Sequence, residues 1–347
     1  MSSEIDVLIG DVQHNCHIAD ARHGSDYGLC TYLMKMREFY RWEMGLGYAQ
    51  RLDKDAVGDW LSQREAVWGE LEQEDYRPLR IGGESHDPFD VESVNRVLRE
   101  YQLVYSGGLG QSGRAQFFLA ELLDYEQGED GFELWVGQRE VARGLHAPPA
   151  MTRGRTIFLR RESLRQFLWE KYESWLWSRP DNAMGRALAC YPFEQDVELA
   201  LDRMTADEMP VIRAHEVGEY RAGKILGPEW EHLLLTVLGT PAELMLRAVR
   251  DHLADCLETL PMVLQGGSVA SLHTFIGNLG HMRKAIFPSL SSAYEAWTSG
   301  DERILAELPH KAAAHWQGVA ERALALEGDS PSAKAEAIAA LVEASHY

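Results

Sequence analysis

Cysteine is scarce in this chain, and its few copies lie far apart. The 347 residues include four cysteines, none of which forms a CxxC pair: Cys16, Cys30, Cys190 and Cys256. Thiols scattered in this way make a poor disulfide framework and are typical of a protein in a reducing compartment. We therefore expect a cytoplasmic location.

Long hydrophobic runs are also missing. No window approaches the roughly 18 to 20 apolar residues that a membrane-spanning helix needs. The opening residues, MSSEIDVLIGDVQHN, contain no basic leader and no extended apolar core. We therefore expect neither a secretory signal nor a membrane partner.

Positive charge is under-represented. Lys and Arg number 34 against 54 Asp and Glu, which gives a formal net charge of −20. A field of that sign repels phosphate backbones, so nucleic acid is not expected as a partner. At 45% hydrophobic and 10% aromatic residues the chain can bury a large core, and its length favours about two domains.

The first half mixes helical and strand patterns. Three short apolar runs separated by Gly-rich turns lie between residues 102 and 137 and predict an antiparallel meander, with residues 155–160 as a fourth strand. Gly108–Gly113 fits GxGxxG, but the following segment has a strand pattern. These glycines therefore predict a hairpin loop and not a nucleotide-binding turn.

The second half is almost entirely helical. Capping-box patterns at Thr205–Glu208 and Thr240–Glu243 predict helix starts, and short loops join long amphipathic segments. These features predict an antiparallel helical bundle over residues 181–347. Residues 1–180 would form a mixed domain with a sheet at about 102–160. The overall fold class is α+β, mostly α.

One segment concentrates metal-binding side chains. HNCHIADARHGSDYG, at residues 14–28, is expected to be a loop that brings together donors for iron, manganese or zinc. The predicted metal ligands in it are His14, His17, Asp20 and His23. Cys16, His17 and Asp20 are the predicted catalytic residues.

The same residues have other interpretations. His and Asp before a helix often cap it, bond to turn amides or pair with arginines. Cys16 could instead be a nucleophile activated by His14 or His17, since a neighbouring imidazolium lowers a thiol pKa. The spacing matches no zinc finger and no HExxH motif.

A second candidate lies on one helix of the second half. His215 and Glu219 are four residues apart and share a helix face, so they form a reserve metal site, alone or joined to the first. The alternative is a solvated helix face with intrahelical ion pairs, such as Glu219 with Arg213 or Lys224. Asp251, Asp255 and Glu258 lie opposite a leucine stripe, and we expect them to face solvent.

The run HNCHIADARHGSDYGLCTYLMKMREFYRWE resembles the opening of a family of uncharacterised bacterial proteins. RTIFLRRESLRQFLWEKYE and HEVGEYRAGKILG are similar to later parts of that family, so the resemblance spans most of the chain. It implies a bacterial, cytosolic protein and assigns no catalytic residue.

These observations lead to two hypotheses of different classes. The first is a metal-dependent enzyme, such as a non-haem iron oxidoreductase, that acts on a small-molecule substrate. The alternative is a non-catalytic interaction or regulatory protein whose helical half binds a protein partner. The sequence is compatible with a homo-oligomer.

Overall fold

The computed structural model describes residues 2–110 and 113–347 and divides into two units. The N-terminal unit comprises the residues up to Met151, with Thr156–Lys171 and Phe193–Thr205. The C-terminal unit comprises Thr152–Arg155, Tyr172–Pro192 and Ala206–Tyr347. The domain boundary predicted near residue 180 stays a prediction.

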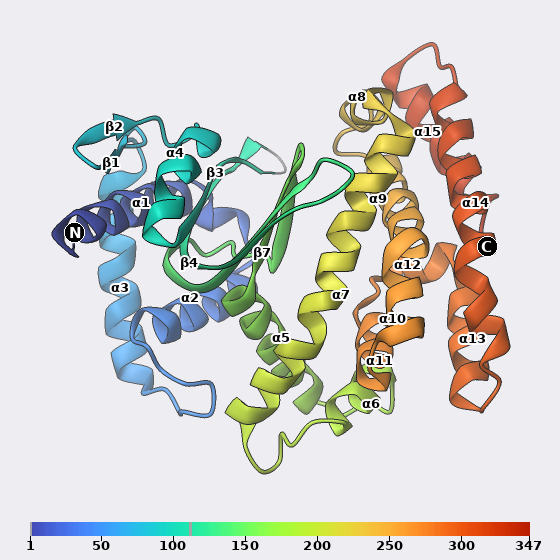
Figure 1. Ribbon diagram of the computed structural model, residues 1–347, viewed down its shortest axis with the longest axis horizontal. Coiled ribbons are helices and arrows are strands. Elements are labelled where there is room, and N and C mark those ends of the chain that lie inside the picture. The colour runs from blue at the N-terminus through green and yellow to red at the C-terminus, as the bar shows by residue number, and fades with distance from the viewer. Residues whose placement is uncertain (1, 111–112) are drawn as a thin grey trace. The chain divides into compact units, whose positions relative to one another are not determined.

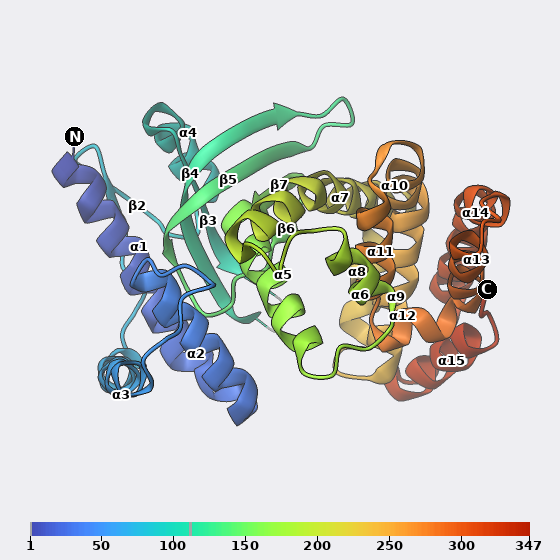
Figure 2. The same ribbon diagram turned by 90° about the horizontal axis from the view of Figure 1, so that it is seen from below.

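Helices in the first part of the chain flank a curled sheet (Figures 1 and 2). The helices are α1 (Ser2–His23), α2 (Leu29–Glu43), α3 (Lys54–Leu71), α4 (Val91–Leu98) and α5 (Arg161–Leu176), with the short turns η1 (Gly24–Asp26) and η2 (Arg99–Tyr101). The strands are β3 (Leu103–Leu109), β4 (Ala115–Gln127), β5 (Glu133–Arg143), β6 (Ala150–Arg153) and β7 (Thr156–Arg160).

The sheet has the order β3-β4-β5-β7-β6 and is mixed. β3, β4 and β5 form the predicted antiparallel meander, whereas β7 pairs with β5 in parallel. The predicted fourth strand is therefore confirmed as a strand. This strand, β7, runs parallel to β5, whereas the next strand of a meander would be antiparallel, because β6 lies between β5 and β7 in the chain. The glycine segment joins β3 to β4 as expected for a hairpin, although Gln111 and Ser112 lie outside the described residues.

A second, two-stranded sheet escaped the sequence analysis. β1 (Leu79–Ile81) and β2 (Glu84–His86) are antiparallel and are joined by Gly82 and Gly83. Both glycines have positive φ, 60° and 82°, as a tight hairpin turn requires. The Gly82–Gly83 pair is the sequence feature from which this hairpin could have been predicted.

α1 corrects one expectation. The His/Cys/Asp segment was predicted as a loop, but residues 14–23 form the second half of this helix. Leu8, Val12, Cys16 and Ala19 recur at helical spacing and are buried in one core cluster with strand residues such as Phe117 and Leu119. Burial of this apolar stripe stabilises the helix through the polar segment.

The second half is the predicted helical bundle. Its helices are α6 (Ala183–Ala189), α7 (Val197–Leu226), α8 (Pro228–Thr236), α9 (Pro241–Ala254), α10 (Leu260–Gly266), α11 (Val269–Asn278), α12 (His281–Ile286), α13 (Pro288–Thr298), α14 (Arg303–Ala325) and α15 (Pro331–Glu343). A large core cluster runs through it, with Trp230 and Trp316 fully buried.

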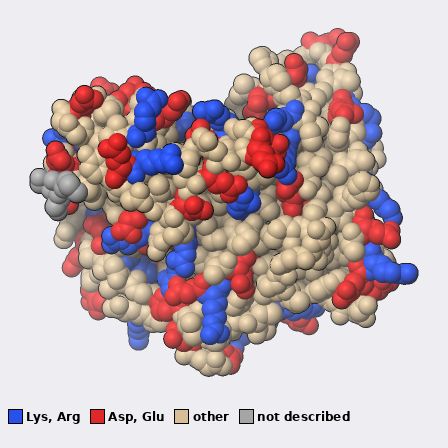
Figure 3. Space-filling model, in the orientation of Figure 1, with Lys and Arg blue, Asp and Glu red and all other residues tan. Residues whose placement is uncertain are grey.

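The helix start predicted at Thr205 is wrong. α7 already begins at Val197, and Thr205 and Glu208 are buried within it. Thr240 does precede α9, and Glu243 accepts a hydrogen bond from the Gly239 amide at 2.7 Å. None of the helices in the described part of the chain is both long and apolar enough to cross a membrane. On the face drawn in Figure 3, acidic and basic side chains are interspersed.

A buried ion cluster ties the sheet to α5. Glu140 on β5 accepts from Arg160 Nε at 2.9 Å, Arg160 Nη2 at 2.8 Å, Ser163 Oγ at 2.5 Å and Arg143 Nη1 at 3.3 Å. Burial alone would raise the pKa of Glu140, but Arg160 and Arg143 hold it below its ordinary value.

Glu140→Ala is expected to destabilise the N-terminal unit by about 3 to 5 kcal/mol, because it leaves buried guanidinium groups without their anion. The measurement is the midpoint of chemical unfolding. The matched control is Glu121→Ala, whose partner Arg139 is largely exposed. That control should cost less than about 1 kcal/mol. Equal losses in the two variants would contradict a structural role for the cluster.

Candidate functional site

An open pocket of about 410 Å³ lies in the N-terminal unit, between the end of α1, the start of α2 and α3. Three of its lining residues are acidic, Asp20, Glu65 and Glu72, and three are aromatic, Tyr27, Tyr32 and Trp68. The others are small or apolar: Ala21, Gly24, Ser25, Leu29 and Gly69. This combination of aromatic walls and a few polar groups is typical of small-molecule sites.

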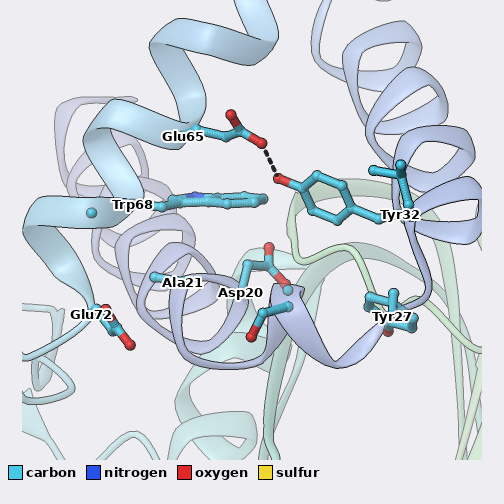
Figure 4. A pocket seen from close by; sticks show the side chains of 11 residues that line it. Asp20, Ala21, Tyr27, Tyr32, Glu65, Trp68 and Glu72 are labelled. Atoms are coloured by element: carbon cyan, nitrogen blue, oxygen red, sulfur yellow. Dashed lines mark hydrogen bonds between the residues drawn. The ribbon is translucent and has the colours of Figure 1, made fainter.

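Figure 4 shows how the labelled side chains converge. Trp68 and Glu65 from α3 lie opposite Tyr32 from α2, and Asp20 lies below them near the centre of the view. Tyr32 donates its hydroxyl hydrogen to Glu65 Oε1 at 3.0 Å. This hydrogen bond fixes the wall where α2 and α3 meet.

Asp20 is the buried acid of the pocket, with 8% of its surface exposed. Both carboxyl oxygens accept from the Leu145 amide, at 3.0 and 3.1 Å. Burial raises the pKa of Asp20 to about 7, although the Leu145 hydrogen bond and the charges of Arg143 and Arg64 oppose the shift. Asp20 can therefore hold or release a proton near neutral pH.

His146 and Tyr27 form a second polar pair near this acid. The Tyr27 hydroxyl lies 3.4 Å from His146 Nδ1. Burial, followed by the charge of Lys35, lowers the pKa of His146 to about 4, so the imidazole is neutral at physiological pH. A neutral ring next to a phenol can accept or relay a hydrogen bond without adding charge.

The structure separates the predicted N-terminal ligands. Successive helix residues are rotated by about 100°, so Cys16 points to the core, away from His14 and His17, and the two histidines have different partners. His14 Nε2 lies 3.1 Å from Glu74, and His23 Nδ1 lies 3.4 Å from Asp26 on the following turn.

His17 is occupied by nitrogen donors. Trp68 Nε1 donates to its Nδ1 at 3.2 Å, and Arg64 Nη1 lies 2.7 Å from its Nε2. Burial and then the charge of Arg64 lower the pKa of His17 to about 3. The ring is therefore neutral, and both of its nitrogens face N–H groups where a metal would need a lone pair.

Cys16 lies in the core. It is 1% exposed, and its thiol donates to the Phe117 carbonyl at 3.3 Å. Burial raises the pKa of Cys16 well above its ordinary value, so the thiolate needed for nucleophilic attack is disfavoured. Of the predicted catalytic residues, Asp20 alone lines the pocket.

Sequence reasoning missed the contribution of α3. Glu65, Trp68 and Glu72 recur at intervals of three and four residues and so lie on one face of α3 and its end. The regular spacing was visible in the sequence. Its connection to Asp20 depends on packing between segments about 50 residues apart.

The reserve candidate belongs to an ion cluster in the C-terminal unit. His215 Nδ1 lies 2.8 Å from Asp255, and His215 Nε2 lies 3.5 Å from Glu219. Arg250 donates to Glu219 at 3.0 Å, and Arg283 donates to Asp255. The carboxylates that a metal would use are thus paired with arginines.

The titratable groups of this cluster have pKa shifts of different direction. Burial raises the pKa of Glu216 to about 7, and its Oε2 accepts from Thr152 at 2.6 Å. Burial also opposes ionisation of Glu219, but His215 and Arg250 hold the pKa of Glu219 at about 2. Burial lowers the pKa of His215, yet the hydrogen bond and charge of Glu219 raise it overall.

Asp251, Asp255 and Glu258 do not form a solvated acidic face. Asp255 is 1% exposed because α7 packs on this side, where a Cβ on Gly218 would lie 2.4 Å from the Ala254 carbonyl. At Asp255–Thr259 the helix changes to a π-turn, and the Leu260 amide bonds to Asp255 O. Pro261, which lacks an N–H and would crowd the preceding turn, follows immediately.

The donor groups do not assemble into a metal centre in the part of the chain that is described. Across residues 2–110 and 113–347, no three His, Cys, Asp or Glu side chains are placed so that they could hold an ion.

Asp20→Asn should change how stability depends on pH. A carboxyl group whose pKa is raised on folding contributes its full stability below the unfolded value, near 4, and loses it as the pH rises through about 7. The loss is on the order of 4 kcal/mol. The variant can still accept the Leu145 hydrogen bond, so we expect it to gain stability relative to the parent between pH 4 and 8.

The measurement is the unfolding midpoint of both proteins across that pH range. Ser25→Ala is the control, because it alters the same pocket without removing a carboxyl group. A pH-independent difference between Asp20→Asn and the parent would show that Asp20 is ionised throughout.

Comparison with known proteins identifies the family. One family model, described as Family of unknown function (DUF6866) N-terminal domain, matches residues 7–160. A second, described as Family of unknown function (DUF6866) C-terminal domain, matches residues 165–345. No curated protein and no solved structure matches the chain. Because the two models together account for nearly all of the sequence, the chain belongs to the DUF6866 family.

Proposed function

We propose that the N-terminal unit is an enzyme that binds a small organic molecule in the Asp20 pocket and uses Asp20 to transfer a proton. The observation that carries this proposal is a nine-tenths buried carboxyl group that lines an open pocket of about 410 Å³. A structural buried acid is normally enclosed by its partners, whereas this one is accessible to a ligand.

Proton transfer suits the electrostatics of this acid. Because burial brings the pKa of Asp20 to about 7, both the acid and its conjugate base are present at neutral pH. A group with a pKa near the working pH is the most effective general acid or base, and such a group contributes about 10² to 10⁴ in rate.

The metal-dependent oxidoreductase predicted from the sequence remains a separate hypothesis. It is supported by the types of donor in residues 14–23, and not by their arrangement, since His17 faces Arg64 and Trp68. Of residues 14–23, the proton-transfer proposal requires only Asp20.

The first test is occupancy of the pocket. A metabolite panel is screened for ligands that raise the melting temperature of the full chain. Ser25→Trp places a large side chain in the pocket lining and should abolish every pocket-dependent shift. Gln63→Trp, at an exposed position on the opposite face of α3 from Glu65, is the matched control and should preserve those shifts.

The second part of the test is turnover. Loss of a metabolite on incubation with the parent protein should fall at least 100-fold in Asp20→Asn, and the parent rate should change with pH through about 7. Turnover by Asp20→Asn at the parent rate, or ligand shifts that persist in Ser25→Trp, would overturn the proposal.

Metal analysis tests the other hypothesis. We expect protein purified without an affinity tag to contain far less than one equivalent of iron, manganese or zinc, because the imidazole nitrogens of His17 face N–H groups. A stoichiometric metal that is lost in His17→Ala and His23→Ala would instead establish the metal-dependent function.

A further inference from the structure

The lining of the Asp20 pocket has a one-sided charge. It contains Asp20, Glu65 and Glu72, and none of its described lining residues is Lys or Arg. Glu65 uses Oε1 to accept from Tyr32, so its second oxygen points to no described hydrogen-bond donor. The arginines that act on Asp20 lie outside the lining and are paired with other acids, Arg64 with Glu43 and Arg143 with Glu140. Carboxyl groups on the lining itself therefore favour a positively charged ligand.

The aromatic walls favour the same kind of ligand. The faces of Tyr and Trp rings attract ammonium and guanidinium groups through the ring quadrupole. Tyr27 already makes such a contact, since Lys35 Nζ lies 5.3 Å from its ring centroid. Tyr32 and Trp68 supply two more rings beside the carboxyl groups.

We propose that the Asp20 pocket selects a small organic cation, namely an amine or a quaternary ammonium compound. The inference rests on the proposed function and names its substrate class. Aromatic faces contact the alkyl groups of the cation, and the carboxyl groups balance its charge. A neutral molecule of the same shape would gain the apolar contacts but leave the acceptors unpaired.

Binding of a cation should displace a proton. Asp20 in its acid form ionises, its proton passes to solvent, and the resulting carboxylate faces the ligand charge. The charged and titratable groups that act on Asp20 or line the pocket with it come from several elements. They are Arg64, Glu65 and Glu72 from α3 and its end, Lys35 and Tyr32 from α2, Tyr27 before it, Cys16 on α1, and Arg143 at the end of β5. The three arginine and lysine side chains favour ionisation of Asp20.

The test uses two pairs of probes on the full chain. Choline is compared with its uncharged isostere 3,3-dimethylbutan-1-ol, and phenethylamine with 2-phenylethanol. Affinities are measured by calorimetry in 0.5 M salt, which screens the general attraction of a −20 protein for cations. We expect at least one cation to bind tenfold or more tightly than its neutral partner.

Variants and proton counting complete the test. Asp20→Asn should weaken binding of that cation at least tenfold, whereas Gln63→Trp, on the opposite face of α3, should leave its affinity unchanged. Repeating the titration in buffers of different ionisation heat should show proton release at pH 6 that disappears at pH 8.

Two failures can be told apart. If neutral probes or sugars bind as well as cations and Ser25→Trp blocks them, the cation inference is wrong and the proposed function stands. If Ser25→Trp affects no ligand, the pocket is not a binding site and both proposals fail. Cation binding that is unchanged in Asp20→Asn also overturns the inference.

Discussion

The central constraint of the N-terminal unit is the burial of a carboxyl group at the last turn of α1. The apolar stripe of α1 holds that helix against the sheet, and the Leu145 amide holds Asp20 in place. The C-terminal end of a helix also carries partial negative charge, which adds to the cost of ionising an acid there. The pocket, its walls and the behaviour of its acid all follow from this placement.

Such an acid is costly to keep. A folded chain gains little stability from a group whose ionised form is disfavoured near neutral pH, and an amide of the same shape would avoid the penalty. Elsewhere the chain handles buried charge differently: Glu140 is surrounded by Arg160, Arg143 and Ser163, and Asp255 is paired with His215 and Arg283. Glu216 has a similarly raised pKa but accepts a hydrogen bond from Thr152 and lines no described pocket. Asp20 differs because it lines an open pocket, and this is the main reason to assign function there.

Local patterns predicted the elements well and their environments poorly. The start of α9 after Thr240, the leucine stripe of that helix and the glycine hairpin between β3 and β4 depend on nearby residues, and each was predicted from the sequence. Whether His17 meets a metal or Arg64, and whether Asp255 meets water or α7, depends on residues tens of positions away. The loop predicted for residues 14–23 failed because clustered polar residues suggested an irregular segment, while the stripe of Leu8, Val12, Cys16 and Ala19 determined a helix.

The π-turn at Asp255–Thr259 joins two stretches of helix that both pack into the core of the C-terminal unit. Each residue of an α-helix is rotated by about 100° from the one before it, so the positions that share a face are fixed along the whole helix. The π-turn ahead of Pro261 contains one extra residue, so it changes which of the following residues lie on a given face. Leu253 before the turn and Leu260 and Val263 beyond it can therefore all face the same core, without a change in one stretch misaligning the other. The irregular turn thus allows the two stretches of one continuous helix to change in sequence independently of each other.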